Sequence, residues 1–188
     1  MIANRDASPS VLTDPIVAVG AVREAWGCEN LPASSDNGSF VKCVAVPSSA
    51  RLSSLQLSAA ASINTTSLDI GAWFPTTIQN QSGYTVQSGV VAGRLIQSSA
   101  FAVAITVPDT TGLIDTDALG TLANNTIPER NMPLWQNLGL AADPGCNIDL
   151  GIVVRTVNTA AGYVGLRARY VRYVKSEGGQ KPPFKFGG

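Results

Sequence analysis

Two segments near the end of the chain alternate apolar and polar side chains with period two, and this pattern constrains the fold more than any other feature. They run over 148–157 and 163–172, on either side of the short sequence NTAAG. Period two is the side-chain period of a β-strand, so the pair predicts an antiparallel hairpin whose even-numbered residues enter the core. The residues expected on its outer face are Asp149, Arg155, Arg167 and Arg169. Asp149 is then the expected partner of the arginines.

Shorter segments of strand-like composition precede this region, with Gly, Pro, Asn and Ser between them. The predicted strands cover residues 15–26, 40–48, 51–60, 67–76, 85–96 and 100–108. The first is ambiguous, because Pro15 after Asp14 also suits the start of a helix. Short strands at this spacing are typical of a β-sandwich, a jelly roll or a barrel. We therefore predict an all-β fold, as a single domain of β-sandwich or jelly-roll type.

The composition changes between 111 and 140, where one or two short helical turns are predicted. Asp115 is expected to cap a turn that begins at Thr116, which we favour over a role in a pair of catalytic or metal-binding carboxylates with Asp117. Within PLWQNLGL, the spacing of Trp135 and Leu138 predicts that both point inward. Trp135 is therefore expected in the core.

Both ends of the chain lack a periodic apolar face. Residues 1–14 are polar and rich in turn formers, and residues 175–188 combine Gly, Pro and Lys with two phenylalanines. Such segments bury too little to offset the entropy of ordering them. We predict an N-terminal arm over 1–14, a β-sandwich domain over 15–174 and a flexible C-terminal tail over 175–188, with both arms ordered only against a neighbouring subunit.

The charge balance argues against two classes of partner. The chain has 13 Lys and Arg against 13 Asp and Glu, so no overall field attracts nucleic acid or an anionic membrane. We expect neither as a partner. Charged residues make up 14% of the sequence, which is below the roughly 25% of ordinary soluble domains. A surface so poor in charge is suited to contact with other protein.

The residue inventory also argues against catalysis. The chain has no histidine, which removes the imidazole base and every His-containing metal site. Cys28, Cys43 and Cys146 are odd in number and have no CxxC spacing, so they are expected to be reduced thiols. The N-terminus lacks the pattern of a signal peptide, so synthesis in the cytosol is expected. We predict no enzyme activity, no metal and no cofactor.

Four segments together resemble a known group of proteins. They are LDIGAWFP at 68–75, LIDTDALGTLA at 113–123, PLWQNLGLAADPGCNIDLGIVV at 133–154 and AGYVGLRARYV at 161–171. In this order and spacing the chain is similar to the head decoration, or cement, proteins of tailed bacteriophages, small structural proteins encoded beside the major capsid protein. The resemblance covers about residues 67–171.

The resemblance implies a virion component that stabilises the capsid from its exterior and is made in the host cytoplasm. The partners it implies are the major capsid protein and further copies of this chain, with a trimer as the expected form. A head-to-tail connector, tail or fibre component is the alternative within the virion. A different class is a carbohydrate-binding module, in which Trp73 or Tyr84 would be exposed and stack on a sugar.

Candidate contact residues lie in the last strand and in the tail. They are Arg167, Arg169, Lys181, Phe184, Lys185 and Phe186. The two arginines lie on the outer face of the predicted hairpin, where a solvated or protein-binding role is favoured over nucleic-acid binding. The two phenylalanines are two residues apart, so an extended tail would present both to one side of a partner, with lysines beside them.

Overall fold

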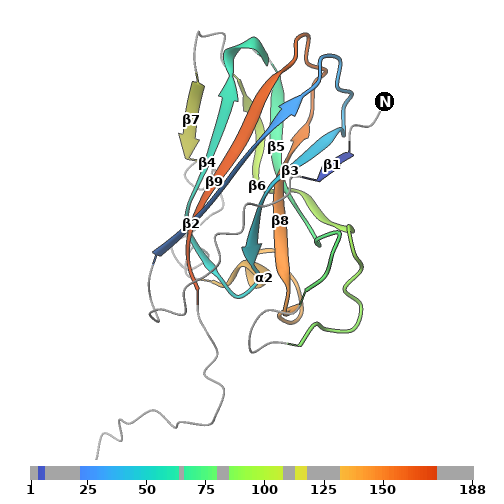
Figure 1. Cartoon of the computed structure of the whole chain (residues 1–188), viewed down its shortest axis with the longest axis vertical. Coiled ribbons are helices and arrows are strands. Elements are labelled where there is room, and N and C mark those ends of the chain that lie inside the picture. Colours follow the sequence, from blue (N-terminus) through green and yellow to red (C-terminus); the bar gives the residue numbers. More distant parts are fainter. Residues whose placement is uncertain are drawn as a thin grey trace, which may run out of the picture.

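The computed structural model describes residues 4–6, 22–63, 66–79, 85–107, 113–117 and 132–172. Within them the chain forms two β-sheets, a single 3-10 turn and a short helix (Figure 1). The elements are β1 (Asn4–Asp6), β2 (Val22–Leu31), β3 (Phe40–Pro47), β4 (Arg51–Ala60), η1 (Ala61–Ile63), β5 (Ser67–Trp73), β6 (Leu95–Thr106), β7 (Leu113–Asp117), α2 (Leu134–Asn137), β8 (Asn147–Val154) and β9 (Gly162–Val171). The predicted all-β class is confirmed.

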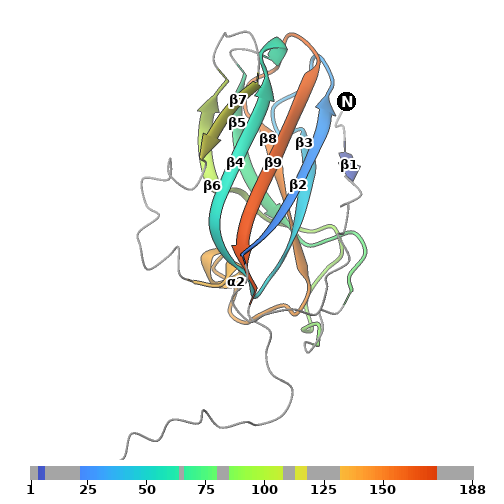
Figure 2. The ribbon, with the colours of Figure 1, turned by 60° about the vertical axis from the view of Figure 1, so that its left-hand side comes forward.

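The strands divide into a five-stranded first sheet and a four-stranded second sheet. The first has the order β1-β3-β8-β5-β6 and the second the order β2-β9-β4-β7. β1, which lies inside the predicted N-terminal arm, runs parallel to β3, and the other described pairs are antiparallel. Figure 2 shows β4, β9 and β2 running side by side as one layer, with β3 and β8 behind them.

One apolar core fills the space between the sheets. β8 contributes Ile148, Leu150, Ile152 and Val154, and β9 contributes Val164, Leu166 and Ala168 from the opposite side. Leu55 and Leu57 of β4 complete the layer on the side of the second sheet. The even-numbered residues of both late strands are therefore in the core, as the period-two pattern predicts.

The predicted hairpin, in contrast, is wrong, because β8 and β9 belong to different sheets. β8 pairs with β3 and β5, whereas β9 pairs with β2 and β4. Asn158 holds the connection between them: its side-chain amide donates to the carbonyl of Pro32 and its Oδ1 accepts from the amide of Ser35. These hydrogen bonds attach the connection to the β2–β3 loop, and the chain crosses from one sheet to the other.

Three other element predictions need correction. β2 continues to Leu31, into residues predicted as loop. The part of the predicted strand before Val22, residues 15–21, lies outside the described residues. The segment 85–94 forms turns, with Gly89 and Gly93 at positive φ, and β6 is one strand that begins at Leu95. Leu113–Asp117 forms β7 against β4, so Asp115 does not cap a helix.

The helical turn predicted around Trp135 is present, but the expected burial of the indole is wrong. Backbone amides of Leu134 and Trp135 donate to the carbonyls of Ala50 and Ser48, which fixes the turn against the end of the sheet. Residues four apart on a helix share a face, so Leu134 and Leu138 both enter the core. Trp135 lies to the side of that face and is half-buried.

This arrangement predicts opposite roles for two adjacent residues. Leu134→Ala empties a fully buried site and should lower the free energy of unfolding by about 2 to 5 kcal/mol. Trp135→Ala should cost clearly less, because part of the indole remains in water in the folded protein. Urea denaturation of both variants measures this, and a larger loss for Trp135→Ala would show that the indole, not Leu134, anchors the turn.

Candidate interaction surface

The outward-facing residues of the second sheet form an open surface, which we call the outer face. Strand register places Glu24 opposite Arg169, Trp26 opposite Arg167, and Gln56 of β4 opposite Arg167 on its other side. The outward positions described on β2, β9 and β4 are Val22, Glu24, Trp26, Cys28, Asn30, Tyr163, Gly165, Arg167, Arg169, Ser54, Gln56 and Ser58. Every outward residue of β2 is exposed, whereas the inward ones are half-buried or buried.

Three large apolar or aromatic side chains project from this face. Trp26 is 63% exposed, Tyr163 is 60% exposed and Val22 is 64% exposed. Such side chains are unfavourable in water and are enriched at protein interfaces. Sequence analysis missed Trp26, because the β2 segment was ambiguous between helix and strand. The signal was present in the sequence: period-two alternation through VREAWGCEN places Trp26 in the same phase as Glu24 and Cys28.

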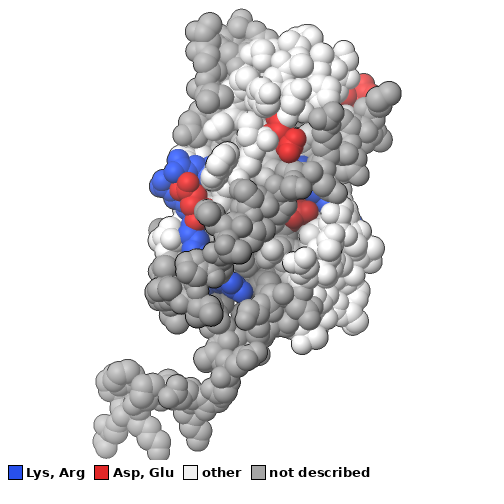
Figure 3. All heavy atoms as spheres, in the orientation of Figure 1, with Lys and Arg blue, Asp and Glu red and all other residues white. Residues whose placement is uncertain are grey.

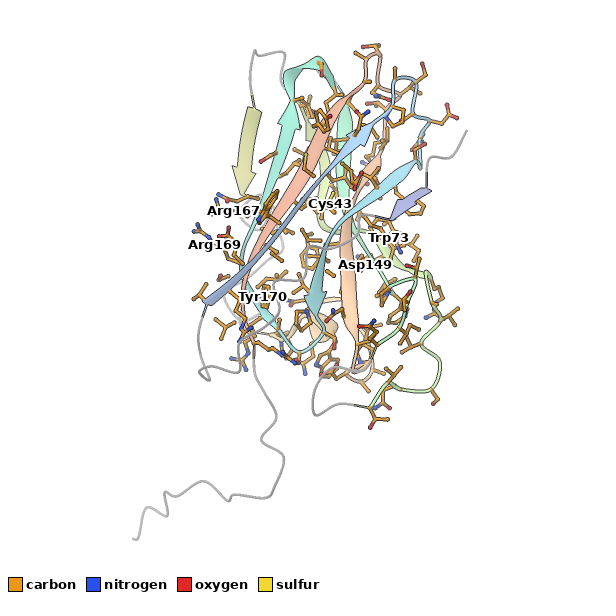
Figure 4. All side chains as sticks on the ribbon, viewed as in Figure 1. Cys43, Trp73, Asp149, Arg167, Arg169 and Tyr170 are labelled. Atoms are coloured by element: carbon orange, nitrogen blue, oxygen red, sulfur yellow. The ribbon has the colours of Figure 1, made fainter. Side chains whose placement is uncertain are left out.

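Arg167 and Arg169 share a single carboxylate on this face. The Nε atoms of Arg167 and Arg169 lie 2.7 and 3.0 Å from the two oxygens of Glu24. In Figure 3 blue and red atoms gather at the left, where Figure 4, in the same orientation, labels the two arginines. The hydrogen bonds from Arg167 and Arg169 hold the pKa of Glu24 below its usual range.

Asp149, the partner expected for the arginines, lies on the first sheet instead. Its Oδ2 is 3.3 Å from Nζ of Lys42, on the neighbouring strand β3. Lys42 also donates to the carbonyl of Phe74 at 3.5 Å. Both side chains are largely buried, so this ion pair belongs to the interior and not to the contact surface. The expectation failed because it depended on the hairpin register.

The outward side of the first sheet is covered by the chain itself. The ring of Trp73 stacks on Phe40 with centroids 5.0 Å apart. It lies against Gly71 and Gly151, where a Cβ atom would come within 2.8 and 3.0 Å of the indole. Trp73 is only 2% exposed, so the expectation that it could stack on a sugar is wrong. Tyr84, the other residue considered for that role, lies outside the described residues.

Other chemistry on the described residues is limited. Burial raises the pKa of the Cys43 and Cys28 thiols, and burial with the charges of Asp143 and Asp149 raises that of Cys146 to about 11. Few thiolates are then present at neutral pH, so these cysteines are poor nucleophiles. The described residues contain no group of three or more His, Cys, Asp or Glu side chains that could hold a metal ion. Within the same residues no helix is long and apolar enough to span a membrane.

The structure describes two of the six contact residues predicted from the sequence. Arg167 and Arg169 lie together on the outer face, as predicted, although with Glu24 as their partner. The tail residues lie outside the described residues: Lys181, Phe184, Lys185 and Phe186.

Comparison with solved structures identifies a similar fold in a phage capsid. A chain in the structure of the capsid of Ralstonia phage GP4 has a TM-score of 0.58 and 14% identity, over 92% of this chain and 100% of that chain. A chain in the capsid asymmetric unit of cyanophage Pam1 has a TM-score of 0.37 and 12% identity, over 86% of this chain and 93% of that chain. No family model and no curated protein matches the sequence. At 14% identity, the likeness to the phage GP4 chain shows a shared fold.

The buried ion pair gives a testable consequence. Asp149→Ala removes the carboxylate that lies 3.3 Å from the buried Lys42 ammonium and should lower the free energy of unfolding by about 3 kcal/mol. The double variant Lys42→Met/Asp149→Leu removes both charges and should recover most of that loss. Arg169→Ala is the matched control, since neither Arg169 nor its partner Glu24 is buried, and its loss should lower the free energy of unfolding clearly less. Equal losses in the two single variants would contradict the burial argument.

The cluster on the outer face predicts a pH dependence. Because the pKa of Glu24 is lowered in the folded protein, its ion pairs persist through the usual range of carboxyl titration and are lost as the pH falls through the lowered pKa. An NMR titration should find a lower midpoint for Glu24 in the wild type than in Arg167→Ala/Arg169→Ala. Identical midpoints would show that the arginines do not act on this carboxyl.

Proposed function

We propose that this chain is a structural virion protein of a tailed bacteriophage, and that it decorates and stabilises the capsid by binding across neighbouring major capsid subunits as a homo-oligomer. The observation that carries the proposal is the fold shared with a chain of the phage GP4 capsid, because the match spans that entire chain and nearly all of this one. The resemblance of residues 67–171 to decoration proteins supports the same role.

The chemistry of the molecule favours adhesion over catalysis. The described residues hold their interior charges in ion pairs such as Lys42 with Asp149, and their thiols have raised pKa values. The exposed aromatic and arginine side chains lie together on one sheet face, which suits contact with protein. We therefore propose no enzyme activity and no cofactor.

Decoration would stabilise a shell through repetition. A protein interface of standard size buries about 1,200 to 2,000 Å² in total. When each oligomer bridges two or more capsid subunits, later contacts become intramolecular and the combined binding exceeds that of one contact. A small all-β domain that binds protein through one sheet face is sufficient for this role, and no catalytic group is needed.

The test compares capsid shells with and without the protein. Shells assembled from the major capsid protein encoded with this chain should unfold at a higher temperature in differential scanning calorimetry after the protein is added. Its copy number in intact particles should approach that of the major capsid protein. Equal shell stability would contradict decoration, and a copy number as low as that of the portal or tail proteins would indicate a connector, tail or fibre component.

A further inference from the structure

A very short strand forms one edge of the first sheet. β1 has three residues and runs parallel to β3, with Asp6 opposite Lys42 (Figure 1). Its sequence, Asn-Arg-Asp, contains no apolar residue, so the strand adds no apolar side chain to the core. Opening an edge strand of this kind is a local event that leaves the shared core intact.

The edge of β3 that receives β1 is limited to the same short stretch. Next to it, β2 crosses β3 so closely that a Cβ atom at Gly27 would overlap the carbonyl of Cys43. The crossing leaves Phe40–Lys42 as the part of the edge where another strand can pair. Val41 and Lys42 are buried there. An unpaired edge is a template for strand pairing, so this stretch needs a strand to cover it.

The connection between β1 and β2 is longer than a path within one copy requires. Both of its ends can be located from the crossing of Gly27 and Cys43: Asp6 lies beside the crossing, and Val22 lies five residues before Gly27 on β2. At about 3.3 Å per strand residue, with the spacing between strands added, the gap is roughly 20 Å. The 15 residues from 7 to 21 can span about 50 Å when extended. The surplus is about the length of a ten-residue strand such as β2.

We propose that in the homo-oligomer β1 of each copy pairs with Phe40–Lys42 of a neighbouring copy, in the register that the structure shows within one chain. This exchange rests on the homo-oligomeric part of the proposed function and identifies the segment that links the copies. It conserves the backbone pairing of β1, because the same residues meet in either arrangement. Strands exchanged in pairs, or passed round a ring, fill every β3 edge, as a closed oligomer requires.

Proximity of the copies favours the exchanged arrangement. An isolated copy has only its own β1 to pair with β3, which is the arrangement in the structure. Copies held side by side present a neighbouring β1 at high effective concentration, and the connection is long enough to reach it. The exchanged strand then ties one domain covalently to a strand paired with the next.

Photocrosslinking of isotopically mixed copies tests the exchange. The full-length chain with Arg5→Cys carries a benzophenone on the new thiol, in a Cys28→Ser background that removes the exposed native cysteine. Unlabelled and 15N-labelled copies are unfolded together in urea, refolded and irradiated as the oligomer. Among crosslinked peptides that join residue 5 to residues 40–42, pairs of one light and one heavy peptide should be as frequent as unmixed pairs.

A second label position provides the matched control. Leu95→Cys, in the same background, places the benzophenone on β6, at the opposite edge of the same sheet. This side chain is exposed, so the substitution should not disturb the core. It should give no crosslink to residues 40–42.

Proline substitutions in β1 test the same contact through affinity. Neighbouring residues of a strand point their amides to opposite sides, so only one of Arg5→Pro and Asp6→Pro removes an amide that faces β3. That variant should raise the dissociation constant of the oligomer about tenfold in sedimentation equilibrium, and the other should raise it clearly less. Both should keep the urea midpoint of the wild type. Val11→Pro, in the connection, is the matched control and should change neither quantity.

Unmixed crosslinks at concentrations where the oligomer is present would show that β1 stays on its own copy, and would overturn the proposal. A dissociation constant that neither proline changes, or a chain that is monomeric both in solution and on shells, would do the same. Shell binding distinguishes this failure from failure of the proposed function. If the chain stabilises shells while the crosslinks are unmixed, decoration stands and exchange fails. If the crosslinks are mixed in an oligomer that does not bind shells, exchange stands and decoration fails.

Discussion

The structure depends on one apolar core that two sheets share and that two central strands, β8 and β9, fill from opposite sides. β8 lies between β3 and β5, and β9 lies between β2 and β4, so each is hydrogen-bonded on both edges. Their apolar residues form a continuous layer between the sheets. The segment that links them is attached to the β2–β3 loop by hydrogen bonds of Asn158.

Each sheet has one side that faces away from the shared core, and the two outward sides differ in how far they are buried. Over the first sheet, Gly71 and Gly151 lack side chains where the indole of Trp73 lies, so the ring packs close to the sheet and is covered. Lys42 and Asp149 are paired in the same layer. The second sheet has no such cover over Trp26. This difference in burial is the physical basis for the proposal that the second sheet is the side that binds other protein.

The exposed side combines features that suit reversible protein contact. Arg167 and Arg169 are held by one carboxylate, and aromatic side chains lie in neighbouring rows. Arginine and aromatic residues dominate binding energy at interfaces because they bury large areas while making directed hydrogen bonds. The fold that presents this side is shared with a chain of a phage capsid.

Local sequence patterns were sufficient to predict the strand class, the inward phase of 148–154 and 164–168, the turn at Leu134 and the outward position of both arginines, because side-chain periodicity and turn chemistry are local properties. Strand pairing, in contrast, is not a local property and is established only when the chain folds. Period two shows that one face of a strand is buried, but it does not show which sheet the strand joins. The partner of Asp149, the burial of Trp73 and the exposure of Trp26 all follow from that choice, since each depends on residues that lie far apart along the chain.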